Sequence, residues 1–62
     1  MPDYDLRVLS RVARLRPLPD SAVRLAERDA IAELRRQGLI RWDLGSHGWT
    51  ITQTGLDALG AW

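Results

Sequence analysis

Apolar residues in the first part of the chain return at helical spacing. Over residues 3–15, leucine, valine and alanine recur every three or four positions, with arginines and a serine between them. Asp3 and Asp5 stand at the start of this stretch, while Arg14 and Arg16 stand at its end. This arrangement of charge suits the helix dipole. The pattern therefore predicts an amphipathic first helix.

Two prolines end this predicted helix. Pro17 and Pro19 cannot donate a backbone hydrogen bond, and each disfavours helical geometry in the residue before it. We therefore expect residues 16–19 to form a tight connector. Asp20 or Ser21 is expected to cap the next helical segment, because a short side-chain oxygen accepts from the first free amides of a helix.

Helix-forming sequence then continues over residues 22–37 and ends at Gly38, a residue type that commonly terminates helices. From Arg28 onward the apolar side consists of Ala30, Ile31 and Leu34. Over the full stretch the apolar stripe wanders, because Leu25 and Ala32 lie away from it. The wandering favours a bend near residues 25–29, and both one bent helix and two shorter helices fit the pattern.

The next stretch alternates between apolar and polar residues with the period of a β-strand. A four-residue loop from Gly45 to Gly48 predicts a hairpin in which Leu44 lies opposite Trp49 and Trp42 lies opposite Ile51. The apolar face comprises Ile40, Trp42, Leu44, Trp49 and Ile51, and the polar face comprises Arg41, Asp43, Thr50 and Thr52. A single apolar face is typical of a small sheet that packs on helices.

A short last helix is predicted from Gln53 to about Ala61, with Thr52 as its cap. The two leucines expected to face inward are Leu56 and Leu59. Gly55 and Gly60 each weaken such a helix by up to about 1 kcal/mol, so its stability would depend on packing.

Length and composition restrict the possible classes of protein. Sixty-two residues make one domain, predicted over residues 1–62. The chain has no cysteine, which excludes a disulfide framework, a thiolate zinc site and a thiol nucleophile. No apolar run is long enough to cross a membrane, and the first residues are acidic. We therefore expect a cytoplasmic protein that does not bind a membrane.

Two parts of the sequence resemble winged helix-turn-helix regulators of the MarR and PadR type. One runs from Ala32 to Ile40 and ends in Gly-Leu-Ile, and the other begins Trp-Thr-Ile-Thr at Trp49, so the resemblance covers about Ala30 to Leu59. It implies a mainly α fold with a small β-hairpin, in the order α-α-(α)-β-β-α. Only residues 21–37 are available for the two helices and the turn that precede Gly38 in this motif, so the helix-turn-helix would be shortened.

The resemblance implies a small DNA-binding protein that regulates transcription, of a size that suits a phage or mobile element. The chain carries nine basic residues, all arginine, and eight acids, for a net charge of +1. Arginine can grip a phosphate with two hydrogen bonds. The residues predicted to contact duplex DNA are Arg24, Arg28, Arg35, Arg36, Arg41, Ser46 and His47. The alternative is that Arg35 and Arg41 form ordinary surface ion pairs with Glu33 and Asp43.

No arrangement of residues predicts catalysis, a metal site, a cofactor or a small-molecule substrate. His47 is the only histidine and lacks an orienting partner in the sequence, and the serines lack the context of a nucleophile. A second functional hypothesis is a protein-interaction module, a small inhibitor or adaptor of a larger complex that does not bind DNA. Trp62 would then be an interface anchor, and either function is compatible with a homodimer.

Overall fold

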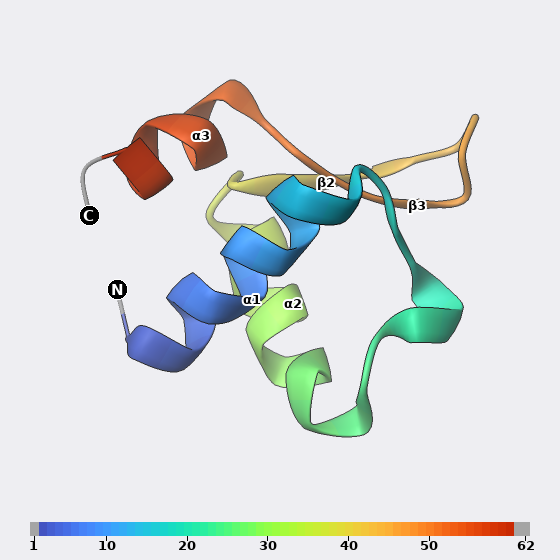
Figure 1. Cartoon of the computed structure of the whole chain (residues 1–62), viewed down its shortest axis with the longest axis horizontal. Helices are drawn as coiled ribbons and strands as arrows, with labels where there is room; N and C mark the ends of the chain where they lie inside the picture. Colours follow the sequence, from blue (N-terminus) through green and yellow to red (C-terminus); the bar gives the residue numbers. More distant parts are fainter. Residues whose placement is uncertain (1, 61–62) are drawn as a thin grey trace.

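The computed structural model describes residues 2–60, and over them the chain is mostly helical with a small antiparallel sheet (Figure 1). In chain order the elements are α1 (Asp3–Leu15), β1 (Leu18–Pro19), η1 (Asp20–Ala22), η2 (Leu25–Glu27), α2 (Arg28–Arg36), β2 (Ile40–Asp43), β3 (Gly48–Ile51) and α3 (Gln53–Gly60). The elements η1 and η2 are single turns of 3-10 helix. The strands follow the order β1-β3-β2, so the middle strand of the sheet is the last in sequence.

The bounds of α1 agree with the prediction from its periodicity. Its buried residues are Val8, Leu9 and Val12. The helix ends because Arg16 adopts a left-handed conformation, with φ of 38°, and Pro17 follows it. The Arg16 amide still donates to the Val12 carbonyl at 3.2 Å.

The prediction that residues 16–19 form only a connector is wrong. Leu18 and Pro19 form β1, in which Leu18 lies opposite Trp49 and Pro19 lies opposite Gly48. A strand of two residues is too short to show alternation in a sequence, and proline is tolerated there because β1 lies at the edge of the sheet. A Cβ atom on Gly48 would lie 2.6 Å from the Pro17 Cβ, so this close pairing requires glycine.

The segment between β1 and α2 is neither one helix nor two full helices. The extended backbone of Val23 and Arg24 separates η1 from η2, close to the predicted bend, and α2 begins at Arg28. The predicted caps, Asp20 and Ser21, lie inside η1, whose first turn has no side-chain cap. The cap comes instead from Glu27, whose Oε1 accepts the Arg24 amide at 2.9 Å. The apolar face predicted for α2 is confirmed, since its buried residues are Ala30, Ile31 and Leu34.

The hairpin is present, but the predicted register is wrong by two residues. Trp42 lies opposite Trp49 and Ile40 lies opposite Ile51. Leu44 therefore falls in the turn, where it is 78% exposed, instead of opposite Trp49. The turn starts early because the Asp43 carboxylate accepts the Ser46 hydroxyl at 2.6 Å and the Gly45 amide at 3.3 Å. A shift of two residues preserves the faces, so the remaining apolar positions stay on one side of the sheet.

Thr52 joins the turn between α2 and β2 to the start of α3. Its amide donates to the Leu39 carbonyl at 3.0 Å, and its hydroxyl oxygen accepts the Gly55 amide at 3.1 Å, as predicted for a cap. Gly38 ends the α2 segment with φ of 75°, in the left-handed region. The inward face of α3 differs from the prediction at Leu56, which is 36% exposed. The inward residues of α3 are Gly55, Ala58 and Leu59.

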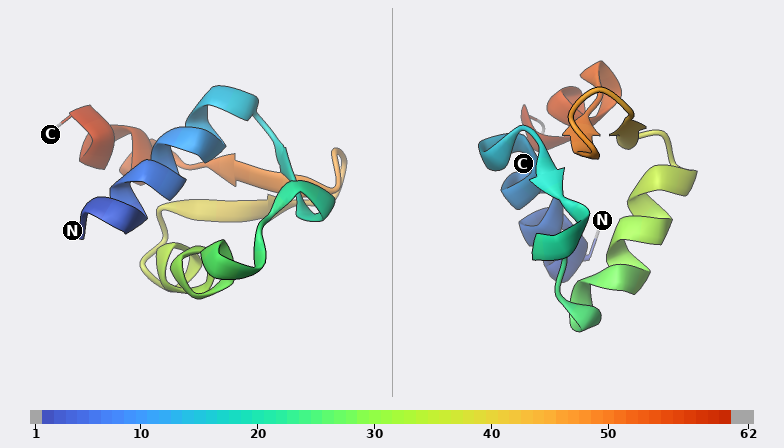
Figure 2. Two further views of the ribbon diagram at one scale, coloured as in Figure 1. Left: turned by 60° about the horizontal axis from the view of Figure 1, so that its bottom comes forward. Right: turned by 90° about the vertical axis from the view of Figure 1, so that its right-hand side faces the viewer.

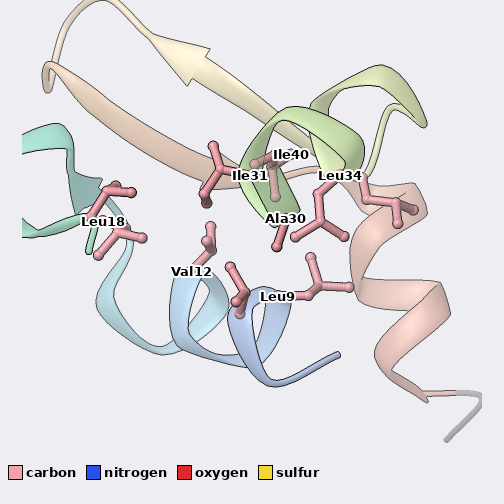
Figure 3. Close-up of a cluster of buried hydrophobic side chains, with 10 residues drawn as sticks. Leu9, Val12, Leu18, Ala30, Ile31, Leu34 and Ile40 are labelled. Atoms are coloured by element: carbon pink, nitrogen blue, oxygen red, sulfur yellow. The ribbon is translucent and has the colours of Figure 1, made fainter. Parts of the chain in front are cut away.

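Side chains from four elements meet in one core. Figure 3 shows residues of α1, α2, β1 and β2 pointing toward one another. The fully buried large side chains are Val8, Leu9, Val12, Leu18, Leu34 and Ile40. In the right view of Figure 2, α1 and α2 lie on the same side of the β2–β3 hairpin. The hairpin turn lies at one end of the molecule, and the start of α1 and the end of α3 lie at the other (Figure 1).

Candidate functional site

The flank of α2 that faces the hairpin carries two of the predicted DNA-contacting arginines. Arg28 and Arg35 are seven residues apart and so lie on one side of the helix, with Ala32 between them. Together with Trp49 they line a depression of about 200 Å³. Asp20 lines the same depression, 4.0 Å from Arg28, and because both side chains are more than half exposed this ion pair holds them only weakly. The depression therefore presents two available guanidinium groups.

Arg36 lies on the exposed face of the same helix, but it is engaged with an acid. Its Nη2 atom lies 2.5 Å from the Glu33 Oε2 and its Nε atom lies 3.2 Å from the Glu33 Oε1. These hydrogen bonds, with one from Gln37, lower the pKa of Glu33, and the pKa of Arg36 is raised by the same contact. The predicted surface pairing of Glu33 thus exists, but with Arg36 in place of Arg35.

Three more of the predicted DNA-contacting residues, Arg41, Ser46 and His47, lie on the hairpin. Arg41 pairs with Thr50 in the hairpin. Because successive residues of a strand point to opposite faces, Arg41 lies on the face opposite to that of Trp42. His47 is exposed in the turn, with φ of 53°. The Ser46 hydroxyl donates to Asp43, and this hydrogen bond is the main cause of a lowered Asp43 pKa; the Arg41 charge also lowers it. Ser46 therefore shapes the turn, and His47 is the more available of the two tip residues.

Arg24 lies away from both of these surfaces. It lines a groove along α1, together with Arg7, Arg11 and Arg14. The predicted set of contacts is thus divided among three places: the α2 flank, the hairpin and the α1 groove. The predicted interface anchor, Trp62, lies outside the described residues.

The α1 groove contains a contact that the sequence analysis missed. Arg11 Nη1 lies 2.7 Å from the Oε1 of Glu27, and its Nη2 donates to the Ala22 carbonyl at 3.1 Å. Glu27 is only 5% exposed. One signal was available, since Arg7, Arg11 and Arg14 are spaced to form a single stripe along a helix. The partner of Arg11 lies sixteen residues further on, which no local pattern reveals.

Comparison of the chain with family models, with curated proteins and with solved structures found no match. The geometry of the chain is therefore the basis for a functional proposal. Over residues 2–60, no group of three histidine, cysteine, aspartate or glutamate side chains could hold a metal ion. None of the helices described for the chain combines the length and the apolar character needed to cross a bilayer.

Proposed function

We propose that this chain is a small winged-helix protein that binds duplex DNA and regulates transcription. The observation that carries the proposal is the position of α2, which directly precedes the β2–β3 hairpin and presents Arg28 and Arg35 on the flank beside Trp49. The pairing of β1 with β3 supports it, because a third strand beside the hairpin turn helps to fix the hairpin relative to the helices. The hairpin then corresponds to the wing.

In this proposal α2 enters the major groove and the hairpin tip lies on the neighbouring backbone. With nine residues α2 is about 13 Å long, comparable to a major groove about 12 Å wide. Arg28 and Arg35 would grip phosphates at the edges of the groove, and His47 would reach the backbone from the tip. Because α2 offers few side chains to base edges, affinity would come mainly from phosphates, and a dimer would double these contacts.

One observation favours a second candidate, a protein-interaction module that does not bind DNA. The outward side of α2 carries Arg28, Asp29, Glu33 and Arg36, which are two acids and two arginines, so this face is close to neutral. Phosphates favour a positive surface. A protein partner would accept a neutral helix face, so the salt dependence of binding distinguishes the two functions.

The test is a titration of a fluorescently labelled random duplex, followed by anisotropy at increasing salt. We expect binding at about 50 mM salt, with log K falling linearly as log salt rises. The double variant Arg28→Gln with Arg35→Gln should reduce this slope by about 2, one for each lost phosphate contact. Arg7→Gln with Arg14→Gln removes the same charge from α1 and should leave the slope nearly unchanged. No binding at about 50 mM would overturn the proposal in favour of the second candidate.

A further inference from the structure

The groove along α1 gathers four of the nine arginines of the chain. It has a volume of about 430 Å³, and four arginines line it, namely Arg7, Arg11, Arg14 and Arg24. Glu27 is the one acid among its lining residues, which leaves the groove with a surplus of three positive charges. The whole chain has a net charge of only +1, so the rest of the molecule is net negative. The positive field is therefore concentrated on this face.

Three of these arginines are free to bind a ligand. Arg11 is held by Glu27 and by the Ala22 carbonyl, so it belongs to the floor of the groove. Among residues 2–60, Arg7, Arg14 and Arg24 form no ion pair, and all three are exposed. Arg7 and Arg14 lie about 10 Å apart along α1, and Arg24 lies on the η2 side of the groove. These three exposed arginines thus line the groove from two different segments of the chain.

The groove also has an apolar part. Val8, which is 2% exposed, belongs to the core beneath the groove, and the ring of Tyr4, which is 46% exposed, is the apolar surface that a ligand can reach. We propose that this groove binds an acidic, amphipathic peptide segment of a partner protein. The carboxylates of the segment would meet Arg7, Arg14 and Arg24, and an apolar side chain would cover the ring of Tyr4.

A nucleic acid fits this groove less well. A duplex presents a broad convex backbone, which contacts exposed surfaces better than a short concavity. Single strands are bound along several nucleotides by a series of stacking aromatic rings, and Tyr4 is the one aromatic residue that lines the groove. Phosphates alone would make no use of the apolar part. The mixed lining therefore favours a peptide.

The test uses a short fluorescein-labelled peptide with a repeating Glu-Leu-Glu unit, titrated with the full chain and followed by anisotropy. We expect saturable binding, lost when glutamine replaces glutamate in the peptide. The double variant Arg7→Gln with Arg14→Gln should weaken binding about tenfold, as expected for the loss of two exposed charge pairs. The matched control, Arg35→Gln with Arg41→Gln, removes an equal amount of charge outside the groove and should change the affinity for the peptide by less than about twofold.

Other outcomes would overturn this proposal. Equal weakening by both double variants would show that the peptide responds only to net charge. Tighter binding of a single-stranded oligonucleotide than of the peptide, lost in the α1 variant, would assign the groove to nucleic acid. Self-association that the peptide does not displace, disrupted by Arg7→Gln with Arg14→Gln, would assign it to a second copy. Circular dichroism of both variants establishes that they are folded. The duplex titration is a separate measurement, so a failure of the peptide proposal would leave the proposal of DNA binding intact.

Discussion

Arg11 and Glu27 form a buried ion pair that joins α1 to the turn before α2, with 2.7 Å between Nη1 and Oε1. The same Glu27 oxygen accepts the Arg24 amide at 2.9 Å, so one carboxylate caps η2 and anchors it to α1. The side chains are 20% and 6% exposed, respectively, which places the pair where solvent screening is weak. This contact fixes the segment that leads into α2, and it therefore determines where the proposed DNA-binding helix begins.

Removal of Arg11 should destabilise the protein strongly. Arg11→Met leaves the buried Glu27 carboxylate without its cation, and we expect a loss of about 3 kcal/mol in the free energy of unfolding. The measurement is urea unfolding followed by circular dichroism. The matched control is Arg14→Met, an exposed arginine of the same helix, which should change stability by less than about 0.5 kcal/mol. Equal effects of the two substitutions would contradict a structural role for the ion pair.

The two glycines of α3 should respond in opposite directions to alanine. Alanine is the better helix former, but a Cβ on Gly55 would lie 2.6 Å from the Ile51 Cγ1, so Gly55→Ala should cost about 1–3 kcal/mol. No atom lies within 4 Å of a Cβ built on Gly60, and Gly60→Ala should gain up to about 1 kcal/mol. Thermal unfolding of both variants measures the difference. A gain at both positions would mean that α3 does not pack closely on β3.

The observed hairpin register predicts that Trp42, and not Leu44, contributes to the stability of the sheet. Trp42 packs edge-to-face on Trp49, with ring centroids 5.2 Å apart. Trp42→Leu should remove about 1 kcal/mol from this aromatic contact alone and reduce the near-ultraviolet dichroism of the tryptophans. Leu44→Ala, in the exposed turn, should change stability by less than about 0.5 kcal/mol. A large effect of Leu44→Ala would instead support the pairing of Leu44 with Trp49.

Protonation of Asp43 should loosen the hairpin turn at low pH. The Ser46 hydroxyl and the Gly45 amide donate to the Asp43 carboxylate and lower its pKa below the ordinary value. Because the folded pKa is lower than the unfolded one, the stabilisation is present above about pH 4 and is lost as pH falls through the folded pKa. An NMR titration of the Asp43 carboxyl carbon measures this midpoint. Ser46→Ala should raise it toward the ordinary value, and an unchanged midpoint would contradict the turn geometry.

The sequence was sufficient to predict those elements that bury one side and expose the other. The period of α1, the buried face of α2 and the polar alternation of the hairpin all follow from burial on one side. The predicted strand register was wrong because the turn depends on the side chain of Asp43. Its hydrogen bonds with Gly45 and Ser46 make the turn begin at Leu44 instead of Gly45. The pairing of β1 was missed because two residues carry no periodic signal.

The candidate site was less predictable than the fold. Arg28 and Arg35 were both among the predicted DNA contacts, and the structure places them beside one depression, whereas Arg24 and Arg41 lie on other surfaces. The extended backbone at Val23–Arg24 precedes η2, and Arg24 lies in the α1 groove. The alternation of β2 places Arg41 on the face of the sheet opposite to Trp42. The stripe of Arg7, Arg11 and Arg14 along α1 can be recognised from their spacing, whereas the contribution of Arg24 to the groove depends on the fold.

An NMR titration is the most direct test of the proposal that α2 and the hairpin bind duplex DNA. A random duplex is added to the labelled protein at about 50 mM salt, and amide shifts are followed along the chain. We expect the largest shifts in residues 28–36 and 44–47, and we expect these shifts to disappear as salt is raised. Shifts confined to residues 7–14, or no shifts in any part of the chain, would contradict the proposal.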